Sequence, residues 1–477
     1  MVEEKKDLGL TAKKDGNFSE WYNQLVLKAG LADYSSVTGC MIIKPYGYAI
    51  WEKIQEYFNK ELKKLKVQNA YFPMFIPENL FKKEAEHVEG FSPEVAWITE
   101  AGSEKLGERL AIRPTSETIM YDTFSKWIRS WRDLPLRINQ WCNIVRWETK
   151  AVKLFIRSRE FLWQEGHCVY ATKEDADYEA KKMLDIYQRM VKELLAIPSI
   201  AGKKTELEKF KGALYTLTLE TLMPDGKAVQ LATSHNLGQN FARVFDIRFK
   251  DKNEQEQMPW QTSWGFSTRL IGAMTMIHSD DKGLVLPPKI APIQIVIIPI
   301  VFEKTKAKVI KKANEIKESL EEFSVELDER DYTPGWKFND WELKGVPIRI
   351  EIGPRDLEKK QVVLARRDGN AKKTVKISGL KKEIPKILDE IQKNIFVRAG
   401  RFLKEKTQFV DKWDSFERVL EEKNMIKAFC CGDSCELAVK EKTGATIRCI
   451  PFDDMKKGKC IYCGKTASEL VYFSKSY

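Results

Sequence analysis

The sequence predicts an α+β fold built from three successive units, at residues 1–286, 287–403 and 404–477. Three observations lead to this prediction. Before residue 286, amphipathic helices mix with short apolar strands, which is typical of an antiparallel sheet with helices packed on it. A proline cluster, LPPKIAP at 286–292, then precedes a regular alternation of strands and helices, which indicates a small α/β unit. Beyond about residue 404 the cysteines gather, which sets the last segment apart.

The first unit contains two long helices and several strands. A helix is predicted over Tyr46 to Val67, because apolar residues recur there at three- and four-residue steps. The NAYFPMFIP stretch that follows is strand-like but is interrupted by Pro73, which favours a sheet edge or an interface. A second helix is predicted over Glu174 to Leu195. Strands of an antiparallel sheet are predicted over Val229 to Thr233 and over Phe245 to Phe249.

The second unit begins with the most apolar stretch of the chain, Ile290 to Phe302. This stretch is too short to span a bilayer and contains Gln294 and two prolines, so we expect a buried strand. Further strands are predicted in SVELDE, PIRIEIG and QVVLARR. They alternate with predicted helices over 304–323, 336–343 and 382–403.

Composition limits the function classes. The 477 residues are 43% hydrophobic, which is enough for roughly three domains with real cores. The formal net charge of +11 favours a polyanionic partner, because neutralising phosphates releases counterions. The amino terminus, MVEEKKD, lacks the apolar segment of a secretion signal, so we expect a cytoplasmic location.

Arginines supply the first sign of chemistry. Neither GxxxxGK[ST] nor GxGxxG occurs, so any bound phosphates must be held by side chains. In RWETKAVKLFIRSREFLWQEGH, at 146–167, Arg146 and Glu148 alternate with Trp147, so on a strand both point to one face. After a loop come Arg157 and Phe161, four residues apart. An isolated RxE is more typical of a surface hairpin with ion pairs.

The combination of motifs favours a nucleotide site. RxE, a loop and RxxxF resemble the second signature of class II aminoacyl-tRNA synthetases. The helix over 46–67 with Pro73 resembles the first signature, and GFSTRLIG, with Arg269, resembles the third. RPTSET, FLWQEGH, TSHNLGQNF and HSDDKGLVLPP together are similar to the motifs of prolyl-tRNA synthetases, in the archaeal and eukaryotic-like subtype without an inserted editing domain. The resemblance covers essentially the whole chain.

This resemblance implies both a fold and an activity. It implies a class II antiparallel-sheet catalytic domain, an α/β anticodon-binding domain and a small α+β C-terminal zinc-binding domain. The implied enzyme is a homodimer whose interface uses the first signature. It activates L-proline with ATP and Mg²⁺ to prolyl-adenylate. It then transfers the prolyl group to the 3′ end of the proline tRNA, releasing AMP and diphosphate.

The resemblance also implies how ATP is bound. Arg146, a planar fork, suits the α-phosphate and the proline carboxylate together, and with Arg269 it is the expected catalytic residue. Positioning and charge stabilisation supply the rate, so no nucleophilic side chain is needed. Arg157 and Arg269 are expected at the outer phosphates. Other residues expected around ATP are Glu148 at the adenine amino group, Phe161 stacked on its ring, and Gln230, Thr233 and Ser267 lining the site.

Proline requires a pocket with two hydrogen-bond acceptors and an apolar wall. The resemblance implies that Thr115 and Glu117 accept the two N–H groups of the secondary ammonium. The other residues implied around the ligand are His235, Trp163, Phe91 and His167, with Glu165 near them. RPTSET is also typical of a helix start, with Thr115 or Ser116 as N-cap, and the two interpretations are compatible.

The cysteine-rich tail predicts a structural zinc site. CCGDSC at 430–435 and CIYC at 460–463 have the spacing of a tetrahedral site. Cys435, Cys460 and Cys463 are expected ligands, and either Cys430 or Cys431 is the fourth. A redox CxxC is disfavoured because nothing nearby resembles a βαβ redox unit. The resemblance further implies that Tyr477 folds back toward the catalytic domain.

The middle unit is expected to contact the two guanines of the proline anticodon. Phe338, Glu342, Arg349 and Arg355 match the positions that the family uses, and such side chains can stack on unpaired bases or pair with their edges. Two alternatives compete with this reading of the chain. One is a non-catalytic, synthetase-like RNA-binding or regulatory protein, which the three phosphate arginines disfavour. The other is a class II synthetase of different amino-acid specificity, which TSE and FLWQEGH disfavour.

Overall fold

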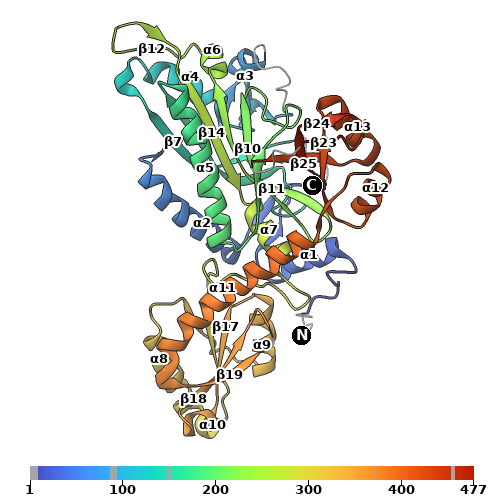
Figure 1. Cartoon of the computed structure of the whole chain (residues 1–477). Coiled ribbons are helices and arrows are strands. Elements are labelled where there is room, and N and C mark those ends of the chain that lie inside the picture. The colour runs from blue at the N-terminus through green and yellow to red at the C-terminus, as the bar shows by residue number, and fades with distance from the viewer. Residues whose placement is uncertain (1–8, 86–93, 148–151, 370, 453–456) are drawn as a thin grey trace.

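The computed structural model describes residues 9–85, 94–147, 152–369, 371–452 and 457–477. Figure 1 shows a large unit built on a broad sheet, a smaller unit below it, and a C-terminal unit that packs against the side of the large one. The long helix α11 (Leu380–Glu405) leads from the smaller unit up to the C-terminal unit. Among the described residues, no helix is both long and apolar enough to cross a membrane. The cytoplasmic location stays a prediction.

One sheet organises the large unit. Within the described ranges it has eleven strands, in the order β20-β21-β25-β22-β9-β10-β11-β14-β8-β7-β3. From β9 to β7 in this order, each strand is antiparallel to the next. Their bounds are β3 (Gln68–Asn69), β7 (Leu136–Val145), β8 (Glu160–Tyr170), β9 (Ile200–Lys203), β10 (Tyr215–Leu222), β11 (Lys227–Gly238), β14 (Trp260–Ser267), β20 (Thr407–Phe409), β21 (Met425–Cys430), β22 (Thr446–Pro451) and β25 (Glu469–Ser476).

A layer of helices and its apolar core cover one face of this sheet. The layer consists of α1 (Phe18–Lys28), α2 (Pro45–Lys64), α5 (Lys173–Glu193) and α7 (Arg269–His278). Phe58 of α2 packs edge-on against Trp264 and Phe266 of β14, which lie on the helical side of the strand. The helices predicted over 46–67 and 174–195 are thereby confirmed, as α2 and α5. Because side chains alternate along a strand, the odd-numbered positions of β8 and β14 face the other way.

The smaller unit is an α/β structure. Its described sheet has five strands in the order β16-β15-β17-β18-β19, in which β15 is parallel to β16 and β17 and the remaining pairs are antiparallel. Ile295 to Ile298 of β15 are fully buried, which confirms the strand predicted within the apolar stretch. The elements are β15 (Ile295–Pro299), α8 (Lys306–Ser319), β16 (Val325–Leu327), α9 (Pro334–Leu343), β17 (Ile348–Ile352), α10 (Pro354–Glu358), β18 (Gln361–Arg366), β19 (Lys372–Lys376) and α11.

The C-terminal unit is fused to the large sheet. Its strands β22 and β25 pair with β9 and β11, so the sheet continues across both units. A buried ion cluster joins them: Glu220 of β10 pairs with Lys204 at 2.8 Å and with Arg448 of β22 at 2.9 Å. The helices of this unit are α12 (Trp413–Glu421) and α13 (Asp433–Thr443). The three domain boundaries stay predictions.

Short elements complete the chain, and two predictions need comment. Residues 245–248 follow the short helix α6 (Asn240–Val244), so the strand predicted over Phe245 to Phe249 is wrong except at Phe249. Pro73 lies between β3, at the edge of the large sheet, and β4, as expected of an edge. The remaining elements are β1 (Ala32–Tyr34), β2 (Met41–Ile43), β4 (Phe75–Pro77), α3 (Glu78–Ala85), β5 (Trp97–Ala101), β6 (Glu104–Ile112), α4 (Glu117–Trp127), β12 (Phe249–Lys250), β13 (Glu256–Gln257), β23 (Gly458–Lys459) and β24 (Thr466–Ala467).

Candidate active site

A polar cavity of about 240 Å³ opens on the large sheet. On β8, Gln164 contacts the Tyr187 hydroxyl of α5 at 2.8 Å, whereas Glu165 and His167 line the cavity. Alternation along the strand therefore separates the helical core from the site. The predicted residues that line this cavity are Thr115, Glu117, Arg146, Phe161, Trp163, Glu165, His167, Gln230, Thr233, His235, Ser267 and Arg269.

An adjoining cavity extends the first. It is lined by Arg157, together with Arg146, Phe161, Ser267 and Arg269, which the two cavities share. Tyr477 also lines it, and its hydroxyl contacts Asp225 Oδ2 at 2.5 Å, so the last residue does reach the large unit. The predicted residues Phe91 and Glu148 lie outside the described part of the chain.

The RPTSET segment joins a helix start to the cavity. Arg113 is almost fully buried and donates to the backbone oxygens of Phe72, at 2.7 Å, and Asn143, at 2.9 Å, which fixes the segment against β7. Helix α4 begins at Glu117 with Ser116 in the N-cap position, as predicted. The Ser116 hydroxyl, however, makes no capping bond to the helix and donates to Glu165 instead.

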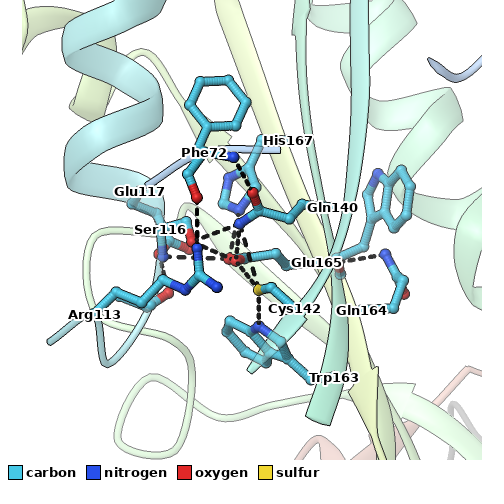
Figure 2. A network of polar contacts seen from close by, with 12 residues as sticks. Phe72, Arg113, Ser116, Glu117, Gln140, Cys142, Trp163, Gln164, Glu165 and His167 are labelled. Carbon is cyan, nitrogen blue, oxygen red and sulfur yellow. Dashed lines mark hydrogen bonds and ion pairs between the residues drawn. The ribbon is translucent and has the colours of Figure 1, made fainter. Parts of the chain in front are cut away.

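Glu165 is the centre of a buried polar network (Figure 2). Its carboxylate accepts from the Ser116 hydroxyl and from the Ser116 N–H, the latter at 3.2 Å. Gln140 donates from 3.2 Å, and His167 Nε2 lies 3.0 Å away. Burial alone raises the pKa of Glu165, but the bonds from His167 and Ser116 outweigh it and the net pKa is lowered. Glu165 is therefore an ionised carboxylate in the wall of the cavity.

His167 acts as its counter-charge. Burial lowers the pKa of His167. The hydrogen bond to Glu165 and the charge of Glu117 raise this pKa by more than burial lowers it, so the net pKa is raised. A protonated ring donates from Nε2 to Glu165 and from Nδ1 to the Tyr121 hydroxyl, which is 3.0 Å away. Glu117 is the second carboxylate that lines the cavity.

Glu117 is suited to a cation. It is almost fully buried, and burial raises the pKa of its carboxyl group. The Thr115 hydroxyl donates to one of its oxygens. A positively charged ligand that hydrogen-bonds to this carboxylate would stabilise its ionised form. This corner, beside the apolar faces of Trp163 and Phe210, can bind a small ammonium group on an apolar ring.

The opposite end of the cavity is cationic. Burial, and then the neighbouring Arg146, lower the pKa of Arg269 to about 10. The guanidinium of Arg146 lies over the rings of Phe161 and Trp163, at 5.7 and 5.6 Å from their centres. Arg269 Nε donates to the Ile156 carbonyl at 3.1 Å, which orients its fork. Arginines gathered at one end of a cavity favour a polyphosphate.

Several residues of the site escaped the sequence analysis. Gln140 and Cys142 of β7 lie opposite Glu165 and Trp163 of β8, and Cys142 Sγ is 3.2 Å from the Trp163 indole nitrogen. These two residues could be identified only from the pairing register of β7 and β8. Phe210 packs at 4.9 Å from the ring of His235. Burial, and then His167, lower the pKa of His235 to about 3, so this ring is neutral.

Four cysteines converge in the C-terminal unit. The Sγ atoms of Cys431, Cys435, Cys460 and Cys463 all lie within 4.8 Å of one another. A tetrahedral zinc ion needs sulfurs about 3.8 Å apart, so the set fits zinc. Cys430 is not brought into this group: it is buried at the end of β21, and its Sγ lies 3.8 Å from the Gly432 carbonyl.

The smaller unit has a groove of about 280 Å³ beside α9. Phe338, Glu342 and Arg349 line it, and the Arg349 guanidinium lies 4.2 Å from the centre of the Phe338 ring. Arg355, at the start of α10, is exposed and is not among the lining residues. Three of the four predicted anticodon residues therefore share one site.

Three family models match consecutive parts of the chain. The model for the tRNA synthetase class II core domain (G, H, P, S and T) matches residues 97–278. The anticodon binding domain matches residues 294–387. The model for the prolyl-tRNA synthetase C-terminal region matches residues 413–477.

Close relatives match the chain over nearly its full length. A protein of Alkaliphilus oremlandii named proline–tRNA ligase is 53% identical, over 97% of this chain and 96% of its own. One of the same name from Natranaerobius thermophilus is 51% identical with the same coverage. A proline–tRNA ligase 2 of Clostridioides difficile is 49% identical over 99% of both chains. The chain belongs to the prolyl-tRNA synthetase family.

Proposed function

We propose that the chain is a proline–tRNA ligase, which forms prolyl-adenylate from L-proline and ATP and transfers the prolyl group to the 3′ end of the proline tRNA. One observation carries the proposal: a single cavity combines an acceptor corner at Thr115 and Glu117 with a cationic end at Arg146 and Arg269. The corner suits proline's secondary ammonium, and the cationic end suits the phosphates of ATP. Relatives named proline–tRNA ligase, about 50% identical over the full chain, support the assignment.

In the proposed mechanism the chain positions the reactants and stabilises charge. Thr115 and Glu117 accept the two N–H groups of proline, and Trp163 packs on its ring. Arg146 binds the proline carboxylate and the α-phosphate together, so that the carboxylate oxygen lies in line with the diphosphate leaving group. Negative charge that grows on the phosphoryl oxygens is stabilised by Arg146 and Arg269. ATP binds as its Mg²⁺ complex, with Arg157 and Arg269 at the outer phosphates.

The remaining predicted roles extend this proposal. Phe161 stacks on adenine, with Gln230, Thr233 and Ser267 around the nucleotide, while His167 and His235 complete the proline side. Phe338, Glu342 and Arg349 contact the anticodon, which their common groove supports. Arg355 contacts the RNA outside that groove. Residues 1–286 form the catalytic domain, 287–403 the anticodon-binding domain and 404–477 the zinc-binding domain.

Direct charging tests the proposal. The purified chain, ATP, Mg²⁺ and total tRNA are incubated with each labelled amino acid, and the charged tRNA is sequenced. Proline on tRNAs with a proline anticodon is the expected product. A charged tRNA that carries another amino acid would assign a different specificity. Specific tRNA binding without any charging would favour the non-catalytic alternative.

We propose a structural zinc ion held by Cys431, Cys435, Cys460 and Cys463, supported by the convergence of their sulfurs. The purified chain is expected to contain about one zinc per chain. Cys431→Ser should lose most of it and unfold at a lower temperature, because a structural zinc stabilises the fold to which it is bound. Cys430→Ser is the matched control, and metal analysis of both variants decides. Loss of zinc from Cys430→Ser alone would contradict this ligand set.

We also propose a homodimer that forms through the segment from β1 to β4. Large apolar side chains are exposed along this short stretch, namely Tyr34, Val37, Ile42, Tyr48, Tyr71 and Phe75. Light scattering on micromolar protein should give twice the mass of one chain. Phe75→Glu should shift the mass toward the monomer, whereas Phe409→Glu, at a more exposed site in the C-terminal unit, should not. A monomeric parent protein would refute the dimer.

A further inference from the structure

Helix α7 connects the two binding sites. At its first residue is Arg269, which lines both halves of the catalytic cavity. Nine residues later, about 13.5 Å along the axis, it ends at His278, and the chain continues into Asp280 and Lys282. Its residues from Leu270 to Met276 are fully buried, so the helix lies in a close-packed environment that transmits strain. Figure 1 places α7 at the base of the large sheet, next to α11.

The segment after α7 is held by the smaller unit. Both Asp280 carboxylate oxygens accept from the Arg367 guanidinium, at 2.8 and 2.6 Å. The remaining donor of that guanidinium, Nε, contacts the Glu342 carbonyl at 3.0 Å. One arginine thus joins the end of α7 to α9, which bears two of the predicted anticodon residues, Phe338 and Glu342. Such a planar two-bond pair fixes direction as well as distance.

Backbone contacts reinforce this junction. The Leu284 N–H donates to the Leu343 carbonyl at 2.9 Å, and Leu286 N–H to the Gly345 carbonyl at 3.4 Å. The approach is so close that a Cβ at Gly283 would lie 2.3 Å from the Leu343 Cα atom. The end of α9 and the segment after α7 therefore cannot shift independently.

The groove itself touches this segment. Lys282, two residues after Asp280, pairs with Glu342 Oε1 at 3.2 Å, and both line the groove. A guanine that hydrogen-bonds to Glu342 would take the place of Lys282 at that carboxylate. Occupation of the groove therefore changes the contacts of the same short segment that continues α7. A packed element that contacts both sites can couple them if each site favours a different position of that element.

We propose that Asp280 and Arg367 are positioning residues that link occupation of the anticodon groove to the placement of Arg269, through α7. This inference rests on the proposed function. Without tRNA, Asp280 and Arg367 hold α7 in the arrangement described here. When the anticodon fills the groove, the 280–286 segment shifts and α7 adjusts the arginine that faces the phosphates. Correct anticodons then raise the rate of charging as well as the affinity for tRNA.

Kinetics with altered anticodons test the link. Charging is measured with the proline tRNA and with the same tRNA carrying one substituted anticodon guanine, and kcat and KM are separated. In the parent protein the substitution should lower kcat roughly 5- to 150-fold, the usual range for coupled sites, and also raise KM. In Asp280→Asn the kcat difference should shrink to within about twofold, while the KM difference remains. Arg367→Gln should also shrink the kcat difference, but because Arg367 lines the groove it should raise KM for both tRNAs. Arg367→Lys should restore part of the kcat difference.

The controls separate positioning from loss of structure. Asp280→Asn should keep tRNA-independent, proline-dependent pyrophosphate exchange near the parent rate. The double variant, Asp280→Asn with Arg367→Gln, should lose no more of the kcat difference than either single variant does. Arg248→Gln, whose partners Asp246 and Glu256 both lie in the large unit, should leave the difference unchanged. An unchanged kcat difference in Asp280→Asn, or a parallel loss of exchange, would overturn the inference. Failure of exchange in the parent protein would instead refute the proposed function.

Discussion

Replacement of Arg146 by alanine is expected to lower prolyl-adenylate formation by roughly 100- to 1,000-fold, the usual effect of removing one positioned transition-state donor. Its guanidinium lies over the rings of Phe161 and Trp163 at the junction of the two cavities, where its charge helps to lower the pKa of Arg269. Binding of tRNA should change little, because the proposed anticodon groove lies in another unit. Pyrophosphate exchange and filter binding measure the two properties.

Two further variants refine this prediction. Arg146→Lys retains the charge but not the planar fork, so it should recover only a small part of the rate if two oxygens are bound at once. Arg159→Ala is the matched control, because Arg159 donates to the Thr38 carbonyl at 3.0 Å and lies outside both cavities. Exchange by Arg146→Ala within tenfold of the parent rate would mean that the phosphate site lies elsewhere.

Replacement of Glu117 by glutamine is expected to raise KM for proline roughly 10- to 100-fold, as for the loss of a hydrogen bond to a charged group. The same variant should change the pH profile. Because burial raises the pKa of Glu117 from 4.5, the parent carboxyl becomes neutral as the pH falls through that raised pKa. A neutral carboxyl attracts the proline ammonium less, so kcat/KM for proline should fall toward acid pH. Glutamine cannot titrate, so this acid limb should disappear.

An oxygen analogue of proline isolates the charge. Tetrahydrofuran-2-carboxylate retains the ring and carboxylate but lacks the ammonium. The parent protein should bind proline much more tightly than this analogue, and Glu117→Gln should lose most of the preference. An unchanged preference, or an acid limb that persists in Glu117→Gln, would show that another group binds the ring nitrogen.

The helices and the order of motifs could be predicted from sequence because both are local signals. Apolar spacing over 46–67 and 174–195 identified α2 and α5 directly. Local motifs also predicted most of the residues that line the cavity. Trp163, Glu165 and His167, for example, occupy alternate positions of one strand and so face the same side.

The rest depends on contacts between distant segments. Gln140 and Cys142 reach the site only through the register of β7 and β8, which no local pattern reports. Sequence spacing could not decide whether Cys430 or Cys431 is the fourth cysteine of the predicted metal site. In the structure, Cys430 at the end of β21 is buried in the core, and Cys431 lies beside the other three cysteines. The cysteine-rich tail was expected as a separate unit, yet its strands extend the large sheet, with a buried ion cluster at the junction.

We propose that this cavity activates proline with ATP. Pyrophosphate exchange with each of the twenty amino acids, in the presence of Mg²⁺ and without tRNA, measures this activity. We expect rapid exchange with proline, far above that with the other amino acids, and loss of that exchange in Arg146→Ala. Absence of proline-dependent exchange, or equal exchange with another amino acid, would contradict it.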